Sequence, residues 1–599
     1  MFTFADSITG RKISNIPMKS LSYLNKYLIK YKWLLIWGTV FVALSNLFYV
    51  FMPMIAKESL DHIIVLAKDS SIERNLWLLS FQIAGLYMLF AAIKGLFLFF
   101  TRQTIIKASR FIEYDLKNEI YQKYQDLSYS FYRKNQTGDL INRISEDVNH
   151  VRMYLGPGIM YGVNLLVMFL LVLPAMWYYS PELSLYALAP LPIMSYLIYK
   201  VSATMNAQSA EVQRKQSDIS TFVQESFSGI NIIKTYLREQ HKASEFSGTA
   251  ENYKVANLKL ALTNGLFMPT ILFLIGLSNI ITIYAGINLI AEGVITEGVV
   301  LSFIFYINML TWPMASLGWV TSLIQRAEAS QARINNFLEE QEALFVDGDI
   351  ALDSINQIEF KNVNYKFANS STPTLNDLNF TIPKGSKTGI VGRTGTGKST
   401  IINLIFRHLD PSSGHVLVNG RPLPDFQIKT YRKMIGAVPQ EVFLFSDTIG
   451  NNIRFGLPED TPDEAVLDAA IFAHVHHNIE EFEDQYDTVL GERGINLSGG
   501  QKQRISLARA VIKKPDLLIF DDSLSAVDTE TEEIILNNIK TKLAGVTTII
   551  IAHRLSSVVD CDQILVLEAG RIAESGTHEE LLNLRGIYAE MYEKQLVEE

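Results

Sequence analysis

Two kinds of apolar pattern divide the chain. Long apolar runs occupy it up to about residue 320, whereas short apolar runs separated by turns follow a charged helix that ends near Glu342. A helix that crosses a membrane needs about 20 mostly apolar residues. Six runs are long enough: 33–56, 76–100, 154–179, 183–201, 261–291 and 294–320. We therefore predict six membrane-spanning helices, since six such runs in one half of the chain argue against a soluble helical core.

The basic residues predict the orientation of these helices. Six Lys or Arg precede the first run, nine lie within 102–153 and eight within 200–259, whereas the three loops between hold only Lys57, Lys68 and Arg74. Loops rich in Lys and Arg stay on the cytosolic side. We expect the N-terminus, the two long loops and everything after the sixth helix to be cytosolic.

The two long loops are amphipathic rather than linker-like. Apolar residues recur at helical spacing from 105 to 151 and from 202 to 259. We expect the spanning helices to continue into the cytosol as two hairpins. Their breaks are predicted at Thr137-Gly138-Asp139, which offers an N-cap, and at Gly229. Short helices at such tips are candidates for docking on another domain.

Polar residues and prolines inside the apolar runs leave several roles open. Lys94 is the one formal charge well inside a run, and we expect it to extend toward the nearby cytosolic end of its helix in preference to a functional role. The asparagines either line a central cavity or form hydrogen bonds between helices. The prolines are expected to kink their helices. These residues are Asn164, Asn264, Asn279, Asn308, Pro174, Pro190, Pro192, Pro269 and Pro313.

The strongest motif of the second part is a phosphate-binding loop. The segment GRTGTGKST follows the strand-like run SKTGIVG and opens the helical run STIINLIF, as the pattern G-x-x-x-x-G-K-[ST] requires. Backbone N–H groups and the helix N-terminus would hold phosphates, with Lys398 neutralising the β- and γ-phosphates and Ser399 ligating Mg²⁺. The predicted nucleotide-binding residues are Gly392, Arg393, Thr394, Gly395, Thr396, Gly397, Lys398, Ser399 and Thr400.

Two carboxylates follow a later apolar strand. The run LLIFDD ends in Asp521 and Asp522. A buried strand that delivers an aspartate to its C-terminal edge provides the carboxylate that Mg²⁺ coordination needs. We predict that Asp521 ligates the metal and that Asp522 orients or deprotonates the attacking water.

A second glycine-rich segment, NLSGGQKQRISLARA, supplies another helix N-terminus suited to anions. One nucleotide cannot engage both this segment and the phosphate loop within one compact domain without a large rearrangement. We therefore expect the segment of one chain to close over the nucleotide bound by another chain. Its predicted ligand-binding residues are Ser498, Gly499, Gly500 and Gln501.

Composition and charge agree with a chain of two unlike parts. The chain is 48% hydrophobic and 19% charged, with a mean hydropathy of +0.15, which excludes a disordered chain, a coiled coil and a nucleic-acid-binding tail. The formal net charge of −9 divides into +7 for residues 1–337 and −16 for residues 338–599. The single cysteine, Cys561, excludes an intramolecular disulfide and a CxxC site.

From Trp33 to the C-terminus the chain resembles a half-transporter of the ATP-binding cassette superfamily, of the exporter type. The family's distinguishing mark, LSGGQ, lies 20 residues before Asp521. The resemblance implies an α-helical membrane domain of six long helices and an α/β P-loop NTPase cassette with a RecA-like core and a helical subdomain. The implied division is a cytosolic segment 1–32, a transmembrane domain 33–325, a linker 326–355 and a cassette 356–599.

The resemblance also implies roles for residues beyond the phosphate loop. Phe367 corresponds to the aromatic residue that stacks on adenine, with Tyr365 as the second candidate. Gln440 is similar to the glutamine that senses and ligates Mg²⁺ and faces the membrane domain. His553 resembles the switch histidine that contacts the γ-phosphate.

Other segments resemble contact elements of the family. Gly491–Gly494 is similar to the exporter loop that touches the partner's intracellular hairpin, and Ser525–Asp528 resembles the D-loop. The segments around Asp139 and Gly229 resemble coupling helices, which join the membrane domain to the cassette.

One position departs from the family pattern. Asp522 stands where the family usually has glutamate, and its side chain is one methylene shorter. The attacking water would then lie about 1 Å from its preferred position, and a shift of that size can cost roughly a hundredfold in rate. This substitution resembles the degenerate site of heterodimeric exporters. We expect a heterodimer with a second half-transporter that carries the glutamate, in preference to a slow homodimer.

The implied function is export or flipping of a hydrophobic or amphipathic substrate, driven by ATP and Mg²⁺ through alternating access. A lipid, a drug and a peptide fit the expected apolar cavity equally well. The implied location is the inner membrane of a bacterial cell, with membrane lipids and a second half-transporter as partners and without nucleic acid. The alternative is a nucleotide-gated channel or regulatory subunit with little hydrolysis of its own.

Overall fold

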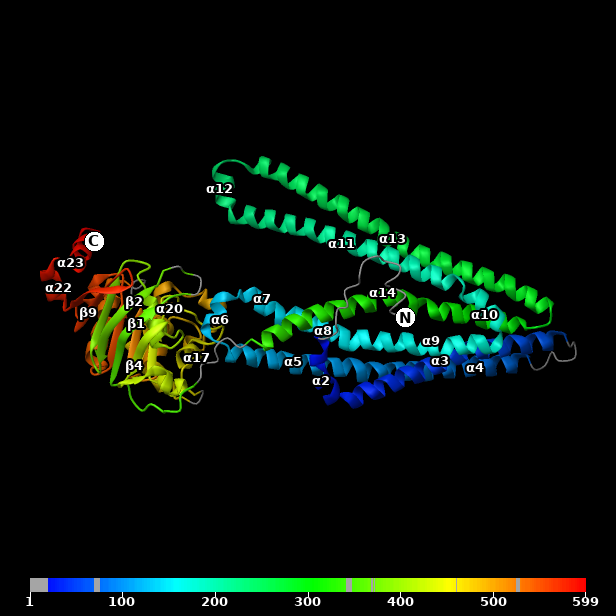
Figure 1. Ribbon diagram of the computed structural model, residues 1–599, viewed down its shortest axis with the longest axis horizontal. Helices are drawn as coiled ribbons and strands as arrows, with labels where there is room; N and C mark the ends of the chain where they lie inside the picture. The colour runs from blue at the N-terminus through cyan, green and yellow to red at the C-terminus, as the bar shows by residue number, and fades with distance from the viewer. Residues whose placement is uncertain are drawn as a thin grey trace. The chain divides into compact units, whose positions relative to one another are not determined.

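The computed structural model (Figure 1) describes residues 20–68, 76–340, 347–367, 370, 372–458, 461–523 and 528–598 of the chain. The described residues form two units. The membrane unit contains the described residues up to Asp126 and from Gln136 to Glu340. The cassette unit combines Leu127–Asn135 with the described residues after Glu340.

The described part of the membrane unit consists of helices joined by short turns. In α3, α4, α9, α13 and α14 the apolar residues extend over windows long enough to cross a membrane, so five candidate spans lie among the described residues. Three short segments, η2 to η4, are π-helical and continue the helices around them. The elements are α2 (Asn25–Lys30), α3 (Lys32–Lys68), α4 (Leu76–Thr101), η2 (Arg102–Ile106), α5 (Lys107–Asp126), α7 (Thr137–Asn142), η3 (Arg143–Asp147), α8 (Val148–Met153), η4 (Tyr154–Gly158), α9 (Ile159–Tyr179), α10 (Pro181–Leu188), α11 (Pro190–Ser228), α12 (Ile230–Thr235), α13 (Glu239–Ala291) and α14 (Glu297–Leu338).

The fourth predicted span, 183–201, is divided between two helices. Helix α10 ends at Leu188, and α11 begins at Pro190, with Pro192 in its first turn. Proline is tolerated at the start of a helix because the first N–H groups have no helical partner there. This segment is not among the five candidate spans, so the sixth crossing stays a prediction.

The cytosolic break at Gly229 is confirmed, whereas the other predicted break is wrong. Gly229 ends α11, and the short helix α12 joins α11 to α13, which run side by side as a hairpin (Figure 1). In the first hairpin the chain is extended at Ser128 and at Asn135. Thr137-Gly138-Asp139 lies inside the first turn of α7, which has Gln136 as its N-cap and no capping side chain.

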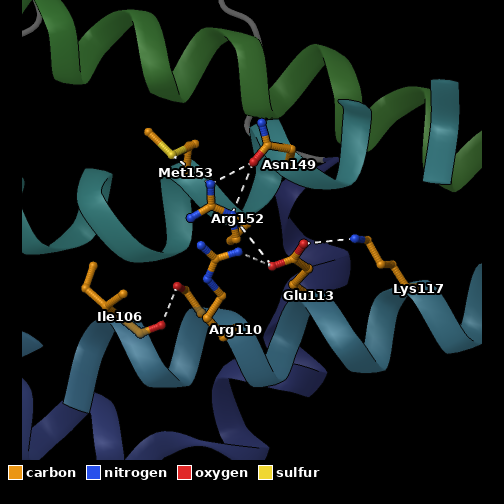
Figure 2. A network of polar contacts seen from close by, with 8 residues as sticks. Ile106, Arg110, Glu113, Lys117, Asn149, Arg152 and Met153 are labelled. Carbon is orange, nitrogen blue, oxygen red and sulfur yellow. Dashed lines mark hydrogen bonds and ion pairs between the residues drawn. The ribbon is translucent and has the colours of Figure 1, made fainter. Parts of the chain in front are cut away.

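A carboxylate joins α5 to α8 within the membrane unit. Glu113 accepts from Arg110 at 2.9 Å and from Lys117 at 3.0 Å, and it lies 3.7 Å from Arg152 of α8 (Figure 2). Arg152 also donates to Asn149 at 2.7 Å. Three cations therefore share one carboxylate at this junction.

The cassette unit contains two sheets. Strand β3 lies between β9 and β8 in a six-stranded sheet of order β10-β9-β3-β8-β7-β6, in which every pair is parallel except β10 with β9. The other sheet is antiparallel, with order β2-β1-β4-β5. The strands are β1 (Gln357–Tyr365), β2 (Leu375–Pro383), β3 (Lys387–Gly392), β4 (Ser413–Val418), β5 (Arg421–Pro422), β6 (Ile435–Val438), β7 (Leu517–Asp521), β8 (Thr547–Ile551), β9 (Gln563–Glu568) and β10 (Arg571–Gly576).

The parallel strands are buried on both faces. In β7, Leu518 and Phe520 pack into one core cluster, and Leu517 and Ile519 pack into another, because successive side chains point to opposite faces of a sheet. The helices of this unit are α6 (Tyr129–Lys134), α15 (Lys398–Ile405), α16 (Ile428–Lys433), α17 (Ile449–Arg454), α18 (Asp463–Phe472), α19 (His476–Glu480), α20 (Gly499–Val511), α21 (Thr529–Lys542), α22 (His578–Leu584) and α23 (Ile587–Glu598).

Helix α6 packs on the cassette through two aromatic contacts. The Tyr129 ring stacks on the His408 ring with centroids 5.0 Å apart, and the Arg133 guanidinium lies 4.6 Å from the centroid of Phe367. Burial lowers the pKa of His408 to about 4, so its ring is neutral near neutral pH. Within the first hairpin, α6 thus belongs to the cassette unit, whereas the segment around Asp139 belongs to the membrane unit and its role as a coupling helix stays a prediction.

Candidate nucleotide site

The phosphate loop lies between β3 and α15, as the sequence predicts. Gly392 and Gly397 have φ values of 150° and 101°, in the region that favours glycine. A Cβ atom on Gly392 would lie 2.4 Å from the Leu567 carbonyl oxygen, and one on Gly397 would lie 2.6 Å from Leu375. The loop is therefore packed tightly on one side, which leaves its backbone as the surface available to a ligand.

Lys398 begins α15 with its ammonium group inside the loop. The side chain is buried, and Nζ donates to the carbonyl oxygens of Gly392 at 2.7 Å and Arg393 at 3.1 Å. Burial lowers the pKa of Lys398, although the carboxylates of Asp522 and Asp521 act in the opposite direction. A buried cation facing two carboxylates is suited to phosphate groups bridged by a divalent metal.

Asp521 lies at the C-terminal end of β7, near Ser399 of the phosphate loop. Burial and the neighbouring charge of Asp522 raise the pKa of Asp521, whereas a hydrogen bond from Ser399 and the nearby Lys398 and His553 oppose that rise. The negative charge of Asp522 thus disfavours the ionised form of Asp521, and a divalent cation beside Asp521 would favour it.

The residues around Asp521 fit Mg²⁺ by the chemistry of their donor atoms. Ser399 offers a hydroxyl, Asp521 a carboxylate and Gln440 an amide oxygen, and Mg²⁺ prefers oxygen ligands supplied by few side chains together with phosphates. No described His, Cys, Asp and Glu side chains form a group of three or more that would hold a metal by themselves. Mg²⁺ at this position would neutralise charge on the phosphates.

Asp522 joins three segments of the predicted catalytic site. Gln440 Nε2 donates to Asp522 Oδ2 at 3.3 Å, and the His553 backbone N–H donates to Oδ1 at 3.3 Å. The His553 ring Nε2 lies 3.9 Å from Oδ2. Asp522 has a φ of 48°, a left-handed conformation that few non-glycine residues adopt. The structure thus brings together all three residues predicted to take part in hydrolysis.

The LSGGQ segment begins α20 with a reciprocal cap. The Gln501 backbone N–H donates to Ser498 Oγ at 3.2 Å, and the Ser498 N–H donates to Gln501 Oε1 at 3.0 Å. Among the described residues, no hydrogen bond or ion pair joins residues 498–501 to the phosphate loop 392–400. The lack of such bonds between the described segments agrees with the expectation that the two segments do not share one nucleotide in one chain.

The two candidate adenine-stacking rings differ in exposure. Tyr365 is buried within β1, whereas Phe367 follows the strand and is partly exposed. The rings meet edge to face with centroids 4.9 Å apart. This difference favours Phe367, whose stacking on adenine stays a prediction.

Two side chains that support the site carry no motif. Arg509 of α20 donates to the carbonyl oxygens of Asn452 at 2.7 Å and Phe443 at 2.9 Å, and burial lowers its pKa to about 10. Gln595 of α23 donates to the His553 carbonyl oxygen at 2.6 Å. In the sequence, Arg509 can be noticed only as a charged residue between apolar residues in LARAV. Gln595 has no comparable sequence signal.

The remaining contact segments are described only in part. Gly491–Gly494 contains a short helical turn in which Arg493 has a φ of 53°. In the predicted D-loop, residues 525–527 lie outside the described residues, and Asp528 caps α21 by accepting from the Thr531 N–H at 2.9 Å. Their contacts with a partner chain stay predictions.

Two family profiles and several relatives match the chain. The profile described as ABC transporter transmembrane region matches residues 35–314, and the profile described as ABC transporter matches residues 375–525. The Bacillus subtilis protein named uncharacterized ABC transporter ATP-binding protein YknU is 33% identical, with 96% of this chain and 98% of the relative covered. Escherichia coli multidrug resistance-like ATP-binding protein MdlA is 35% identical, covering 85% and 87%.

A solved structure is similar over nearly the whole chain. It is titled as a bacterial Atm1-family ABC exporter with ATP bound, and it has a TM-score of 0.76 at 26% identity. The match covers 96% of this chain and 99% of that one. The shared architecture is a helical membrane domain followed by an α/β nucleotide-binding cassette.

Proposed function

Because the chain belongs to the ATP-binding cassette transporter family, of the exporter type, we propose that ATP at its phosphate loop drives a hydrophobic or amphipathic substrate across the membrane by alternating access. Family membership makes the chain a multi-pass membrane protein and an ATPase coupled to transport. The proposal concerns how its own residues perform that coupling. The observation that carries it is the meeting of Gln440, Asp522 and His553 at the end of β7.

Each residue has a proposed role in the reaction. Lys398 and the loop N–H groups bind the phosphates. Ser399, Asp521 and Gln440 would hold Mg²⁺, which would supply charge neutralisation at the phosphates. Asp522 orients the attacking water or accepts its proton, and His553 contacts the γ-phosphate. Phe367 stacks on the adenine ring.

We propose that two chains form each nucleotide site. Ser498–Gln501 of one chain would close over the nucleotide on the phosphate loop of another, which agrees with the lack of any described bond between these segments within this chain. Since Asp522 is shorter than glutamate, the favoured partner is a different half-transporter whose own site carries the longer base.

Closure of two cassettes is proposed to move the membrane helices through α6 and α12. ATP can shift the equilibrium only by binding the closed state more tightly than the open one. The Tyr129 and Arg133 contacts with His408 and Phe367 support α6 as one link, because Phe367 is also the predicted adenine-stacking residue.

The proposed orientation places both termini in the cytosol of a bacterial cell.

Leaflet transport tests this proposal against the channel alternative. Inside-out membrane vesicles containing the chain and its native partner are supplied with NBD-labelled phosphatidylglycerol in the outer leaflet. We expect ATP with Mg²⁺ to raise the dithionite-protected fraction above the level reached without ATP, and vanadate to abolish the increase. Equal protection with ATP and with a non-hydrolysable analogue would contradict hydrolysis-driven export and favour gating by nucleotide binding alone.

A further inference from the structure

Two adjoining cavities lie within the membrane unit. The inner cavity has a volume of about 310 Å³ and is lined by α3, α4, α9 and α14, with Lys94 and Arg102 among its lining residues. The outer cavity has a volume of about 520 Å³ and is lined by η2, α5, η4, α9 and α14, with Lys107 in its wall. Both are lined by Arg102, Met160 and Tyr161, so they meet at these residues.

Lys94 points into the inner cavity rather than along its helix toward the cytosol. Its Nζ lies 3.3 Å from the centroid of the Tyr49 ring on α3. The Asn46 side chain, also in the cavity wall, donates to Asn164 Oδ1 at 2.9 Å. This position differs from the expected extension toward the cytosolic end and favours a functional role for Lys94, because a charge retained inside a membrane domain is costly.

Four cations line the two cavities, and one of them, Arg110, is ion-paired with Glu113. Within the described part of the chain, Lys94, Arg102 and Lys107 form no ion pair with Asp or Glu. Glu113, the carboxylate next to the outer cavity, is shared among Arg110, Lys117 and Arg152 (Figure 2). Within the described residues, the charges of Lys94, Arg102 and Lys107 are therefore not neutralised by a carboxylate, and Lys94 instead faces the Tyr49 ring. At 1.5 Å per residue, Lys94 and Arg102 are about 12 Å apart along the axis.

The rest of the inner cavity is mostly apolar. Met160, Met168 and Trp312 contribute to its wall, and methionine side chains adapt to irregular apolar ligands. A volume of about 310 Å³ lies at the lower end of the range for small-molecule sites. The inner cavity thus combines apolar side chains that suit a hydrocarbon tail with cations that suit an acidic head group.

We propose that the inner cavity binds an amphiphilic anion, with its acidic head group on Lys94 and its apolar tail against Met160, Met168 and Trp312. Arg102 is a second cation of the wall, where the two cavities meet. The proposal rests on the export function and specifies its substrate class as a phosphate- or carboxylate-bearing amphiphile. Lys107 provides a further cation on the route from the outer cavity. A cationic amphiphile of the same size is repelled by the same charges.

Equilibrium binding without nucleotide tests the ligand class separately from transport. The full-length chain in phosphatidylcholine nanodiscs is titrated with dodecyl phosphate, dodecyltrimethylammonium and inorganic phosphate, and tryptophan fluorescence is followed because Trp312 lines the inner cavity. We expect dodecyl phosphate to bind at least tenfold more tightly than the ammonium compound, and inorganic phosphate to give no saturable change. Equal binding of the two amphiphiles would overturn the proposal, whether or not the chain transports lipid.

Variants of Lys94 identify the contact. Lys94→Met keeps the length and removes the charge, and it should weaken dodecyl phosphate binding by roughly tenfold to a hundredfold, as expected for loss of a charge-assisted hydrogen bond. Lys94→Arg should restore binding, and Lys259→Met, at an exposed position of α13, should leave it unchanged. Dodecyl phosphate binding that is unaffected in a folded Lys94→Met protein would overturn the assignment.

A second arm distinguishes membrane lipid from a free amphiphile as the source of the anion. The same titration is repeated in nanodiscs that contain phosphatidylglycerol. Weaker apparent binding of dodecyl phosphate there supports competition by an anionic lipid head group at the same cations. Unchanged binding there supports a non-lipid amphiphile, provided that the Lys94→Met variant still loses affinity.

Discussion

Replacing Lys398 with alanine should strongly weaken nucleotide binding at this chain's phosphate loop. The Lys398 ammonium is buried inside the loop and donates to the carbonyl oxygens of Gly392 and Arg393, so it is fixed where phosphate oxygens would lie. Removing one partner of a buried charge pair typically costs about 2–5 kcal/mol or more. At 1.4 kcal/mol for each factor of ten, the affinity for ATP should fall by about thirtyfold to several thousandfold.

The measurement is titration of the purified chain with a fluorescent ATP analogue in the presence of Mg²⁺. Lys361→Ala provides the control, because Lys361 is an exposed lysine on β1 of the same cassette. Thermal unfolding of both variants shows whether the cassette is folded. Wild-type affinity in a folded Lys398→Ala protein would show that the phosphates bind elsewhere.

Replacing Asp522 with glutamate should raise ATP turnover by the chain alone by roughly tenfold to a hundredfold. Asp522 is held by Gln440 and by the His553 N–H group, so a longer side chain would project from an already fixed position toward the phosphate loop. The additional methylene moves the carboxylate by about 1 Å, and a misplacement of that size can cost on the order of a hundredfold in rate. Asp522→Asn, which removes the base, should leave only background turnover.

Steady-state phosphate release by the purified homodimer measures this effect. Asp353→Glu is the matched control, since it makes the same substitution at an exposed position outside the site. Rapid turnover by the unmodified homodimer, abolished in Asp522→Asn and unchanged in Asp522→Glu, would refute the weakened-site proposal and with it the preference for a heterodimer.

Local sequence patterns were sufficient to predict the elements that position the phosphates. The run before Gly392 forms β3, the run after Gly397 forms α15, and LLIFD forms β7. Each depends on interactions between near neighbours: glycine conformations, a helix start and a strand buried on both faces. The apolar runs predicted the long helices for the same reason.

Contacts between distant residues decided the features that the sequence did not predict. The break in the first hairpin lies on either side of α6, where Tyr129 stacks on His408, and no local pattern reveals that pair. The sequence predicts an N-cap within Thr137-Gly138-Asp139, but these residues lie inside α7. Asp139 pairs there with Arg143. Arg509 and Gln595 donate to backbone carbonyls, which every residue carries, so no sequence pattern identifies their partners.

The direct test of the account is whether ATP changes the side from which the inner cavity is reached. Asn308 lines that cavity, and Cys561 is the only cysteine in the chain, so an Asn308→Cys, Cys561→Ala variant carries a single reporter thiol. The variant, assembled with its native partner in vesicles of both orientations, is treated with a membrane-impermeant maleimide. Our account predicts labelling from the cytosolic side without nucleotide and from the opposite side with ATP and vanadate. Labelling from the same side in both conditions, or from both sides at once with ATP, would contradict alternating access.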